Sequence, residues 1–372
     1  MIKLDFVEEN NKRNISQCFI LYLDKECSAS EKETVCNFSC THCYYRFSNQ
    51  KWKTLLEIKQ EIDNQFRSGA THVQITGAEP TMYKNIIEVI DHIKAKNILC
   101  SVITNGYLIS IDSIAKQYKG KVDYFLMSIH GHKKKWDEVA NMKGAYEKTL
   151  KALNNCYKYN IEVHFNTTIL KQNYKDLGAI VNLAMEWNVK RISFICFNPF
   201  VSFKSAAGQK QVDKLIVSYD DMMPKLEEAF DLCQANNIDF CMRYFPYCKV
   251  PEHMRQYVFN YSTLQFDSNE WNYKYWFPTQ FLNAKPMMDN VIKNRGLEGD
   301  SIEQKQLHAF GRFFPGFRTN FIEAEHCKMC NDYLICDTPH AEQMEKFPKQ
   351  KFEGTKPPFK KNCKYYINKE EL

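Results

Sequence analysis

Three cysteines within eight residues constrain this chain more than any other feature of its sequence. Cys36, Cys40 and Cys43 are spaced C-x3-C-x2-C, shortly after an apolar segment, Cys18–Leu23. Three close thiolates without a fourth suit an iron–sulfur cluster that leaves one iron open, whereas a closed structural zinc site takes four protein ligands. An open iron can bind and activate a small molecule, so the fold must hold this loop where such a molecule can reach it.

Composition limits the class of protein and its partners. Of 372 residues, 44% are hydrophobic and 25% are charged, which is ordinary for a globular chain with one large and one smaller domain. The net charge of +6 indicates a solvated basic surface, because no basic and aromatic stripe argues for nucleic acid. The charged start is no signal peptide, and no apolar run approaches the roughly 20 residues that span a bilayer. Fifteen cysteines then indicate metal and reduced thiols, so we expect a cytoplasmic protein with no membrane partner.

Short apolar strands alternate with amphipathic helices up to about residue 200. Apolar residues recur every three to four positions in Trp52–Ser68, in Tyr83–Lys96 and near 110–118, 145–159 and 173–187, which predicts helices. Strands are predicted at Cys18–Leu23, His72–Thr76, Leu99–Thr104, Tyr124–Ile129, Glu162–Leu170 and Arg191–Asn198. Six such repeats with right-handed crossovers predict an α/β fold, a partial (β/α)6 TIM-like barrel. Ligands of these sheets lie at the carboxyl ends of the strands, where the cysteine loop begins.

The cysteine run resembles the cluster-binding loop of the radical S-adenosylmethionine (radical SAM) enzymes, with His42 at their usual aromatic position. The resemblance implies that the three cysteines hold a 4Fe–4S cluster whose free iron binds the amino and carboxylate groups of S-adenosylmethionine. One electron then cleaves the bound molecule to methionine and a 5′-deoxyadenosyl radical. A reducing partner such as flavodoxin or ferredoxin is implied as well.

The turn after the second strand fits the same family. Gly77-Ala78-Glu79-Pro80 resembles its Gly-Gly-Glu-Pro motif, which binds the amino group of S-adenosylmethionine. Gly77 allows a close approach of the backbone, and Glu79 offers a carboxylate to an ammonium group. Ala78 replaces the second glycine, but backbone carbonyls can still bind the cofactor there.

Polar residues end the later strands. The resemblance, which covers about residues 17–200, places Ser128 at the ribose, Asn166 at the ribose or carboxylate, and the backbone of Asn198 at the adenine. His130 follows the fourth strand, where it could act as an acid or base, contact the substrate, or close the strand as a polar residue. The other thiols of this half are expected to be small buried hydrophobes: Cys18, Cys100, Cys156 and Cys196.

A second cysteine run, C-x2-C-x5-C, consists of Cys327, Cys330 and Cys336. With His340, these residues satisfy by count a structural Cys3His zinc site. Downstream of a radical SAM core, the run resembles the SPASM or twitch extensions, which carry auxiliary 4Fe–4S clusters. That resemblance makes Cys363 the fourth ligand, with Cys248 as its rival and Cys241 as a weaker candidate. The upstream C-x9–15-G-x4-C of a full SPASM domain is missing, so we expect one auxiliary cluster.

Two domains are expected from these patterns. Residues 1–240 would form the radical SAM partial barrel, including a helix at Tyr219–Asn236. Residues 241–372 would form a smaller SPASM/twitch-like domain with the auxiliary cluster. Ile238–Phe245 is strand-like and lies at their junction. The aromatic stretch 249–326 would be either a loop-rich cap over the substrate or a packed subdomain, with mainly structural aromatics.

The resemblance implies a radical SAM enzyme of oxidoreductase type that takes a hydrogen atom from its substrate. Only about 16 residues precede the first strand, too few for a leader-binding domain, so we expect a small polar metabolite such as a sugar or nucleotide derivative. The alternative substrate is a ribosomal peptide or a protein side chain. A non-catalytic electron carrier or redox sensor would explain the cysteines, but not the cofactor-like residues at successive strand ends.

Overall fold

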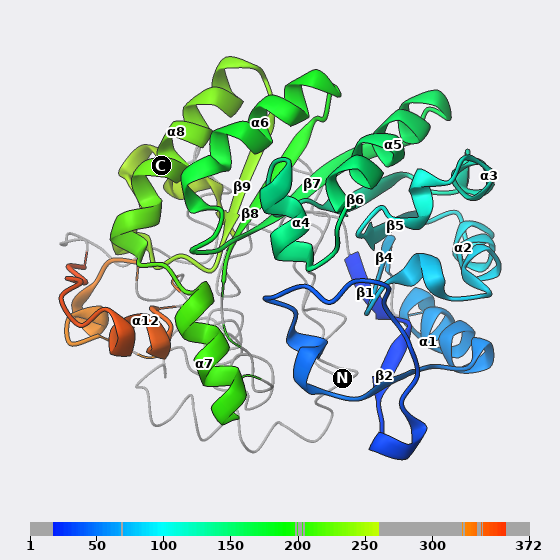
Figure 1. Cartoon of the computed structure of the whole chain (residues 1–372), viewed down its shortest axis with the longest axis horizontal. Coiled ribbons are helices and arrows are strands. Elements are labelled where there is room, and N and C mark those ends of the chain that lie inside the picture. Colours follow the sequence, from blue (N-terminus) through cyan, green and yellow to red (C-terminus); the bar gives the residue numbers. More distant parts are fainter. Residues whose placement is uncertain are drawn as a thin grey trace.

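The computed structural model describes residues 18–67, 70–197, 199, 203, 205–259, 322, 324–332, 336 and 338–354. Within them, eight parallel strands form one curled sheet in the order β1-β4-β5-β6-β7-β8-β9-β10, shown in Figure 1. The strands are β1 (Cys18–Tyr22), β4 (His72–Thr76), β5 (Leu99–Thr104), β6 (Tyr124–Ser128), β7 (Glu162–Ile169), β8 (Arg191–Cys196), β9 (Asp239–Arg243) and β10 (Val258–Phe259). The predicted partial barrel is confirmed, and the six expected strands are its first six.

The strand-like segment at residues 238–245 also belongs to this sheet. It forms β9, which pairs in parallel with β8, and the short β10 pairs with β9 in turn. The barrel therefore continues beyond six strands. The expected division at residue 240 falls within β9, and the second domain stays a prediction.

Helices cover the outer face of the sheet (Figure 1). They are α1 (Leu55–Arg67), α2 (Ile86–Lys94), α3 (Asp112–Ala115), α5 (Ala145–Lys158), α6 (Leu177–Glu186) and α8 (Tyr219–Ala235). Each lies where a helix was predicted. Two further helices, α4 (Lys134–Ala140) and α7 (Ala206–Leu215), follow β6 and β8, and α12 (Ala341–Lys346) lies in the C-terminal part. The basic run at residues 133–135 overlaps the start of α4.

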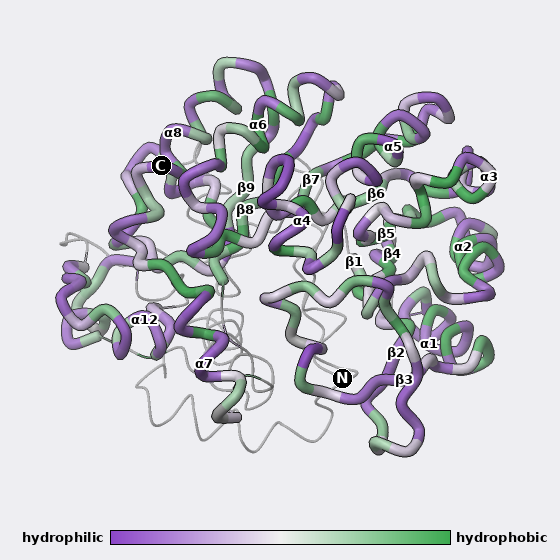
Figure 2. Tube along the Cα trace, in the orientation of Figure 1, coloured by the Kyte–Doolittle hydropathy of each residue, from purple (hydrophilic) through white to green (hydrophobic). Residues whose placement is uncertain are grey.

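The main core lies between the sheet and the outer helices. Val73 and Ile75 of β4 are fully buried there with Ile58 and Ile62 of α1. Apolar residues that face this core alternate with polar ones along strands such as β4, and Figure 2 shows hydrophobic segments on β8 and β9. The predicted burial of Cys100, Cys156 and Cys196 is confirmed; the Cys18 side chain lies outside the described part.

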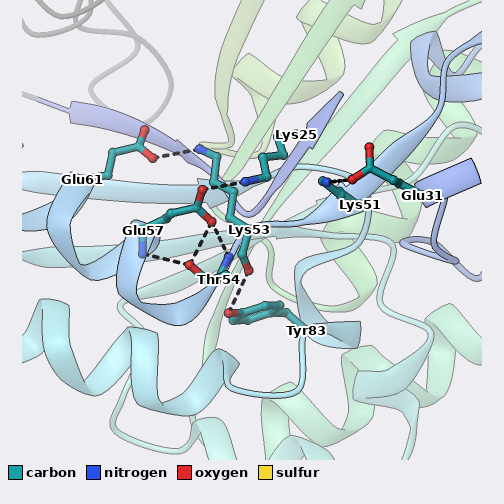
Figure 3. Close-up of polar contacts among 8 residues, drawn as sticks. All are labelled: Lys25, Glu31, Lys51, Lys53, Thr54, Glu57, Glu61 and Tyr83. Carbon is teal, nitrogen blue, oxygen red and sulfur yellow. Dashed lines mark hydrogen bonds and ion pairs between the residues drawn. The ribbon is translucent and has the colours of Figure 1, made fainter. Parts of the chain in front are cut away.

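A two-stranded antiparallel hairpin, β2 (Asp24–Glu26) with β3 (Gln50–Trp52), frames the cysteine loop. Figure 3 shows how it joins α1. Thr54 Oγ1 accepts from the Glu57 N–H at 3.3 Å, and the Glu57 carboxylate accepts from the Thr54 N–H at 2.7 Å. This reciprocal cap explains why the helix begins at Leu55 rather than at the predicted Trp52. Lys25 Nζ adds an ion pair to Glu57 at 2.5 Å.

No helix within the described ranges is long and apolar enough to cross a membrane.

Candidate functional site

The cysteine loop lies over the carboxyl ends of several strands, held there through one residue, Thr41. The Thr41 N–H donates to Val139 O at 2.9 Å, and its hydroxyl donates to Gln172 Oε1 at 3.1 Å. Its carbonyl accepts from Gln211 Nε2 at 2.9 Å. These partners come from the connections after β6, β7 and β8. The loop that leaves β1 is therefore fixed by three other strand–helix connections.

An apolar cluster supports the loop from below. Phe38 of the loop packs edge-on against Trp136, with ring centroids 6.0 Å apart, and Cys36 and Cys40 pack against the same cluster. Trp136 is fully buried, and its Nε1 donates to Thr149 Oγ1 at 2.9 Å. Two of the three thiols thus lie against surroundings that exclude water.

The thiols themselves form a donor set for a metal cluster. Cys36 Sγ accepts from the Phe38 N–H at 3.4 Å and from Asn105 Nδ2 at 3.9 Å. Burial raises the pKa of all three thiols, that of Cys36 to about 12. Three neighbouring thiols of one loop fit a cluster, in which each thiolate would bind a different iron.

The turn after β4 has a backbone that only glycine suits. Gly77 has φ +128°, and a Cβ there would lie 2.1 Å from Asp24 Oδ1. That oxygen instead accepts from the Ala78 N–H at 3.0 Å, and the Glu79 N–H donates to Val35 O at 3.0 Å. The turn is thus bonded to the hairpin on one side and to the cysteine loop on the other.

The Glu79 carboxylate is buried and accepts four hydrogen bonds. Its Oε1 accepts from Thr81 N at 3.1 Å, from Thr81 Oγ1 at 2.6 Å and from Thr104 Oγ1 at 2.7 Å. Its Oε2 accepts from Asn105 N at 2.7 Å. In this geometry Glu79 fixes the turn to the end of β5.

His42 and His130 contact each other at the mouth of the barrel. Their rings lie edge to face with centroids 4.4 Å apart. His130 is buried, and its Nδ1 accepts from the Thr168 N–H at 2.8 Å, so a neutral ring carries its proton on Nε2. Burial, with a smaller effect from His42, holds the pKa of His130 well below its usual range. The backbone hydrogen bond and the burial both favour the neutral ring of His130.

Ser128 and Asn166 lie side by side, as expected for two residues at one cofactor. Ser128, the last residue of β6, is the register partner of Asn166, which lies within β7 three residues before its end. The Oδ1 atom of Asn166 is buried and has no hydrogen-bond partner in the described part of the chain. An unpaired buried amide oxygen costs free energy unless a ligand supplies a donor. Asn198, expected at the adenine, lies outside the described residues.

Comparison with known families agrees with this geometry. Residues 34–184 match the family model of the radical SAM superfamily. This segment is a radical SAM domain. The matched radical SAM domain begins just before the cysteine loop and ends within α6.

Similar proteins extend the comparison. The chain is 33% identical over 162 residues to an Fe-coproporphyrin III synthase of Methanosarcina barkeri, covering 43% of this chain and 41% of that protein. It is 24% identical over 163 residues to the antilisterial bacteriocin subtilosin biosynthesis protein AlbA of Bacillus subtilis, covering 43% and 36%. The matches thus span less than half of these relatives. SuiB of Streptococcus suis bound to S-adenosylmethionine has a TM-score of 0.51 at 16% identity, covering 64% of this chain and 53% of that one, a likeness of fold.

The second cysteine group of this radical SAM protein gathers beside the barrel. Three thiols of the run and Cys248 line one pocket: Cys248, Cys327, Cys330 and Cys336. His340 is buried and pairs through Nδ1 with Glu342 Oε2 at 2.6 Å. Cys241 is buried within β9. Neither His340 nor Cys241 is among the described residues that line the pocket, and Cys363 lies outside the described part.

Sequence reasoning missed three side chains that position the radical SAM loop: Asp24, Asn173 and Gln211. Asn173 is fully buried; its Nδ2 donates to His130 O and Thr168 O, each at 2.8 Å, and clamps the ends of β6 and β7 together. Asp24 could have been found as a carboxylate directly after a buried strand. The bonds of Gln211 to Thr41 and of Asn173 to His130 leave no local signal, because these partners are distant in sequence.

Proposed function

We propose that this protein is a radical SAM enzyme of oxidoreductase type that removes a hydrogen atom from a small polar metabolite, such as a sugar or nucleotide derivative. A 4Fe–4S cluster on Cys36, Cys40 and Cys43 would supply the electron that cleaves S-adenosylmethionine to methionine and a 5′-deoxyadenosyl radical. The turn at Gly77 and Ala78 would receive the amino group of S-adenosylmethionine. The apolar cluster under the loop would keep water from the radical.

Ser128 and Asn166 would hold the rest of the cofactor. Their place as register partners on the adjacent strands β6 and β7 supports contacts to the ribose or the carboxylate. The buried, unpaired Asn166 Oδ1 can accept from a ribose hydroxyl. His130 would orient His42 and the loop, since its Nδ1 is engaged by the backbone.

The polar interior of the barrel carries the proposal of a polar substrate. Val73 and Ile75 pack outward into the main core, so the residue between them, Gln74, faces the interior. There its Nε2 donates to Ser101 Oγ at 3.3 Å, and Tyr124 stacks on His164 with centroids 4.3 Å apart. Gln74 Oε1 is buried and accepts no hydrogen bond from any described residue. Such a lining favours a ligand rich in hydroxyl or amide groups.

A peptide or protein side chain is the second candidate. The likeness to AlbA, named for bacteriocin biosynthesis, favours it. The second cysteine group supports an oxidative outcome in either case, because an auxiliary iron–sulfur cluster can take an electron from a substrate radical.

The substrate class can be tested with anaerobically reconstituted protein, dithionite and S-adenosylmethionine. Nucleotides, sugar nucleotides and short peptides would be added in separate reactions, and the rate of 5′-deoxyadenosine formation measured. We expect a nucleotide or sugar derivative to raise the rate. When that substrate is deuterated at the reacting carbon, the deuterium should appear in 5′-deoxyadenosine. Stimulation by peptides alone would contradict the small-metabolite assignment and leave the cleavage of S-adenosylmethionine intact.

A further inference from the structure

We propose that Cys248 is the fourth ligand of the second cysteine group and closes an iron–sulfur site with Cys327, Cys330 and Cys336. The inference rests on the proposed function, since it specifies the auxiliary cluster invoked there. The family resemblance would give the fourth position to Cys363. The described geometry points instead to a cysteine supplied by the barrel itself.

The four thiols surround a hollow. They line one pocket together with Thr338, Phe352 and Gly354. A cluster with one thiolate on each of four irons needs four thiols around a hollow, and these four thiols line one pocket. A zinc ion would instead draw its ligands to a single point, and the metal content tests the two arrangements against each other.

One feature of the pocket parallels the first cysteine loop, and a second shows how closely the backbone approaches a thiol. The Thr338 N–H donates to Cys336 Sγ at 3.3 Å, as the Phe38 N–H donates to Cys36 Sγ at 3.4 Å. In both cases the donor lies two residues after the cysteine. Gly354 also lines the pocket, and a Cβ on it would lie 2.9 Å from Cys330 Cβ and 3.2 Å from Cys330 Sγ. Only a bare backbone can pass this close to the thiol.

Cys248 is held firmly in place at the pocket. It lies in a single 3-10 turn, η8 (Tyr247–Lys249), and the flanking Tyr247 and Val250 are buried in the main core. Lys249 Nζ pairs with Asp220 Oδ1 at 2.8 Å and lies 4.8 Å from the centroid of the Phe352 ring. The turn that bears Cys248 therefore contacts both α8 and Phe352, which lines the same pocket.

The C-terminal wall is anchored to the barrel as well. Gln350 Oε1 accepts from the Tyr219 N–H at 2.8 Å, and Gln343 Nε2 donates to Val217 O at 2.7 Å. These bonds fix the segment at 338–354 against the start of α8. The pocket is thus assembled from two segments about 80 residues apart in sequence, and Cys248 is the thiol contributed by the first.

A closed site has a functional consequence. The first cysteine loop follows β1, and η8 follows β9, so the two thiol groups lie at the same edge of the sheet but toward opposite ends of its strand order. A cluster with four protein thiolates can exchange an electron with a substrate that lies between the two cysteine groups. It offers no free iron to that substrate. The site is therefore suited to electron transfer and not to direct binding of substrate.

Iron binding tests the proposal separately from S-adenosylmethionine chemistry. The full chain with Cys36→Ala, Cys40→Ala and Cys43→Ala retains only the second group, and after anaerobic reconstitution we expect about four irons per chain. Adding Cys248→Ala should lower the iron content and, after oxidation, give the electron paramagnetic resonance signal of a three-iron cluster. Adding Cys363→Ala, the matched control, should change neither. Loss of iron with Cys363→Ala, retention with Cys248→Ala, or stoichiometric zinc in place of iron would overturn the proposal.

Two measurements do not depend on the stability of the Cys248 variant. In the intact reconstituted protein, alkylation followed by mass spectrometry should leave Cys248 unmodified and modify Cys363; the reverse pattern would overturn the ligand assignment. Cyanide, as a probe of open iron, should leave the resonance spectrum of the second cluster unchanged. A cyanide-induced change in that spectrum would overturn closure of the site.

Discussion

The Glu79 carboxylate accepts a hydrogen bond of 2.7 Å from the backbone N–H of Asn105. This bond joins the turn after β4 to the end of β5. Asn105 in turn donates through Nδ2 to Asn37 Oδ1 at 2.8 Å, within the cysteine loop. One chain of hydrogen bonds therefore connects the loop expected to hold the cluster with the turn expected to bind the amino group of S-adenosylmethionine.

Replacing this carboxylate should be costly. Glu79→Gln puts an amide donor where four donors already point, so at least one buried group loses its partner. We expect a loss of about 1–3 kcal/mol in the free energy of unfolding, measured by denaturant titration, together with weaker binding of S-adenosylmethionine. Glu88→Gln removes a surface ion pair to Lys59 and should cost under about 1 kcal/mol. Equal costs for the two variants would contradict the buried role of Glu79.

Gly77→Ala should disrupt the turn by collision. The new methyl group would displace Asp24 from the Ala78 N–H, in addition to the backbone strain of a positive φ. Gly120→Ala is the matched control, because Gly120 has φ +70° and a Cβ there meets nothing within 4 Å. We expect a cost of about 1 kcal/mol for the control and a larger cost for Gly77→Ala, with loss of S-adenosylmethionine binding. Similar binding by both variants would refute the close approach.

Two substitutions can distinguish positioning of the cysteine loop by His130 from acid or base catalysis by its ring. His130→Asn keeps an acceptor near the Thr168 N–H, whereas His130→Ala leaves that buried N–H unpaired, at about 1–3 kcal/mol. If His130 only positions the loop, His130→Asn should retain most of the formation of 5′-deoxyadenosine and His130→Ala should lose it. Acid or base catalysis by the ring would instead be lost equally in both.

Gln211 should affect how firmly the loop keeps its cluster. Gln211→Ala removes the hydrogen bond to Thr41 O from the connection after β8. We expect iron to be lost to a chelator several times faster, with unfolding changed by only about 1 kcal/mol. The control is Gln209→Ala on the same helix, α7, which removes a hydrogen bond to Phe203 O. Equal rates of iron loss in the two variants would argue against a specific role for Gln211.

The strands and outer helices could be predicted because their signals are local. His72–Thr76 and Leu99–Thr104 are apolar stretches bounded by turns, and their predicted limits agree with β4 and β5. The short α4 was missed because its lysine-rich start obscures its buried residues, Trp136 and Val139. β9 was seen as a strand but not assigned to the barrel, since membership of a sheet depends on pairing with distant residues.

The candidate site was predictable only in part, for the same reason. The cysteines and the Gly77 turn stand out by spacing. The hydrogen bonds that hold the Glu79 carboxylate, however, come in part from Thr104 and Asn105, about 25 residues away. The sequence favoured Cys363 by pattern, whereas the place of Cys248 beside Cys327 depends on how the chain returns to the barrel.

Formation of 5′-deoxyadenosine tests the central claim most directly. Anaerobically reconstituted wild-type protein would be given dithionite and S-adenosylmethionine, beside the Cys36→Ala/Cys40→Ala/Cys43→Ala variant under the same conditions. We predict that the wild type binds S-adenosylmethionine and forms 5′-deoxyadenosine and methionine, and that the variant forms neither. Equal product from the variant, or no binding of S-adenosylmethionine by iron-loaded wild type, would contradict the assignment of these three cysteines.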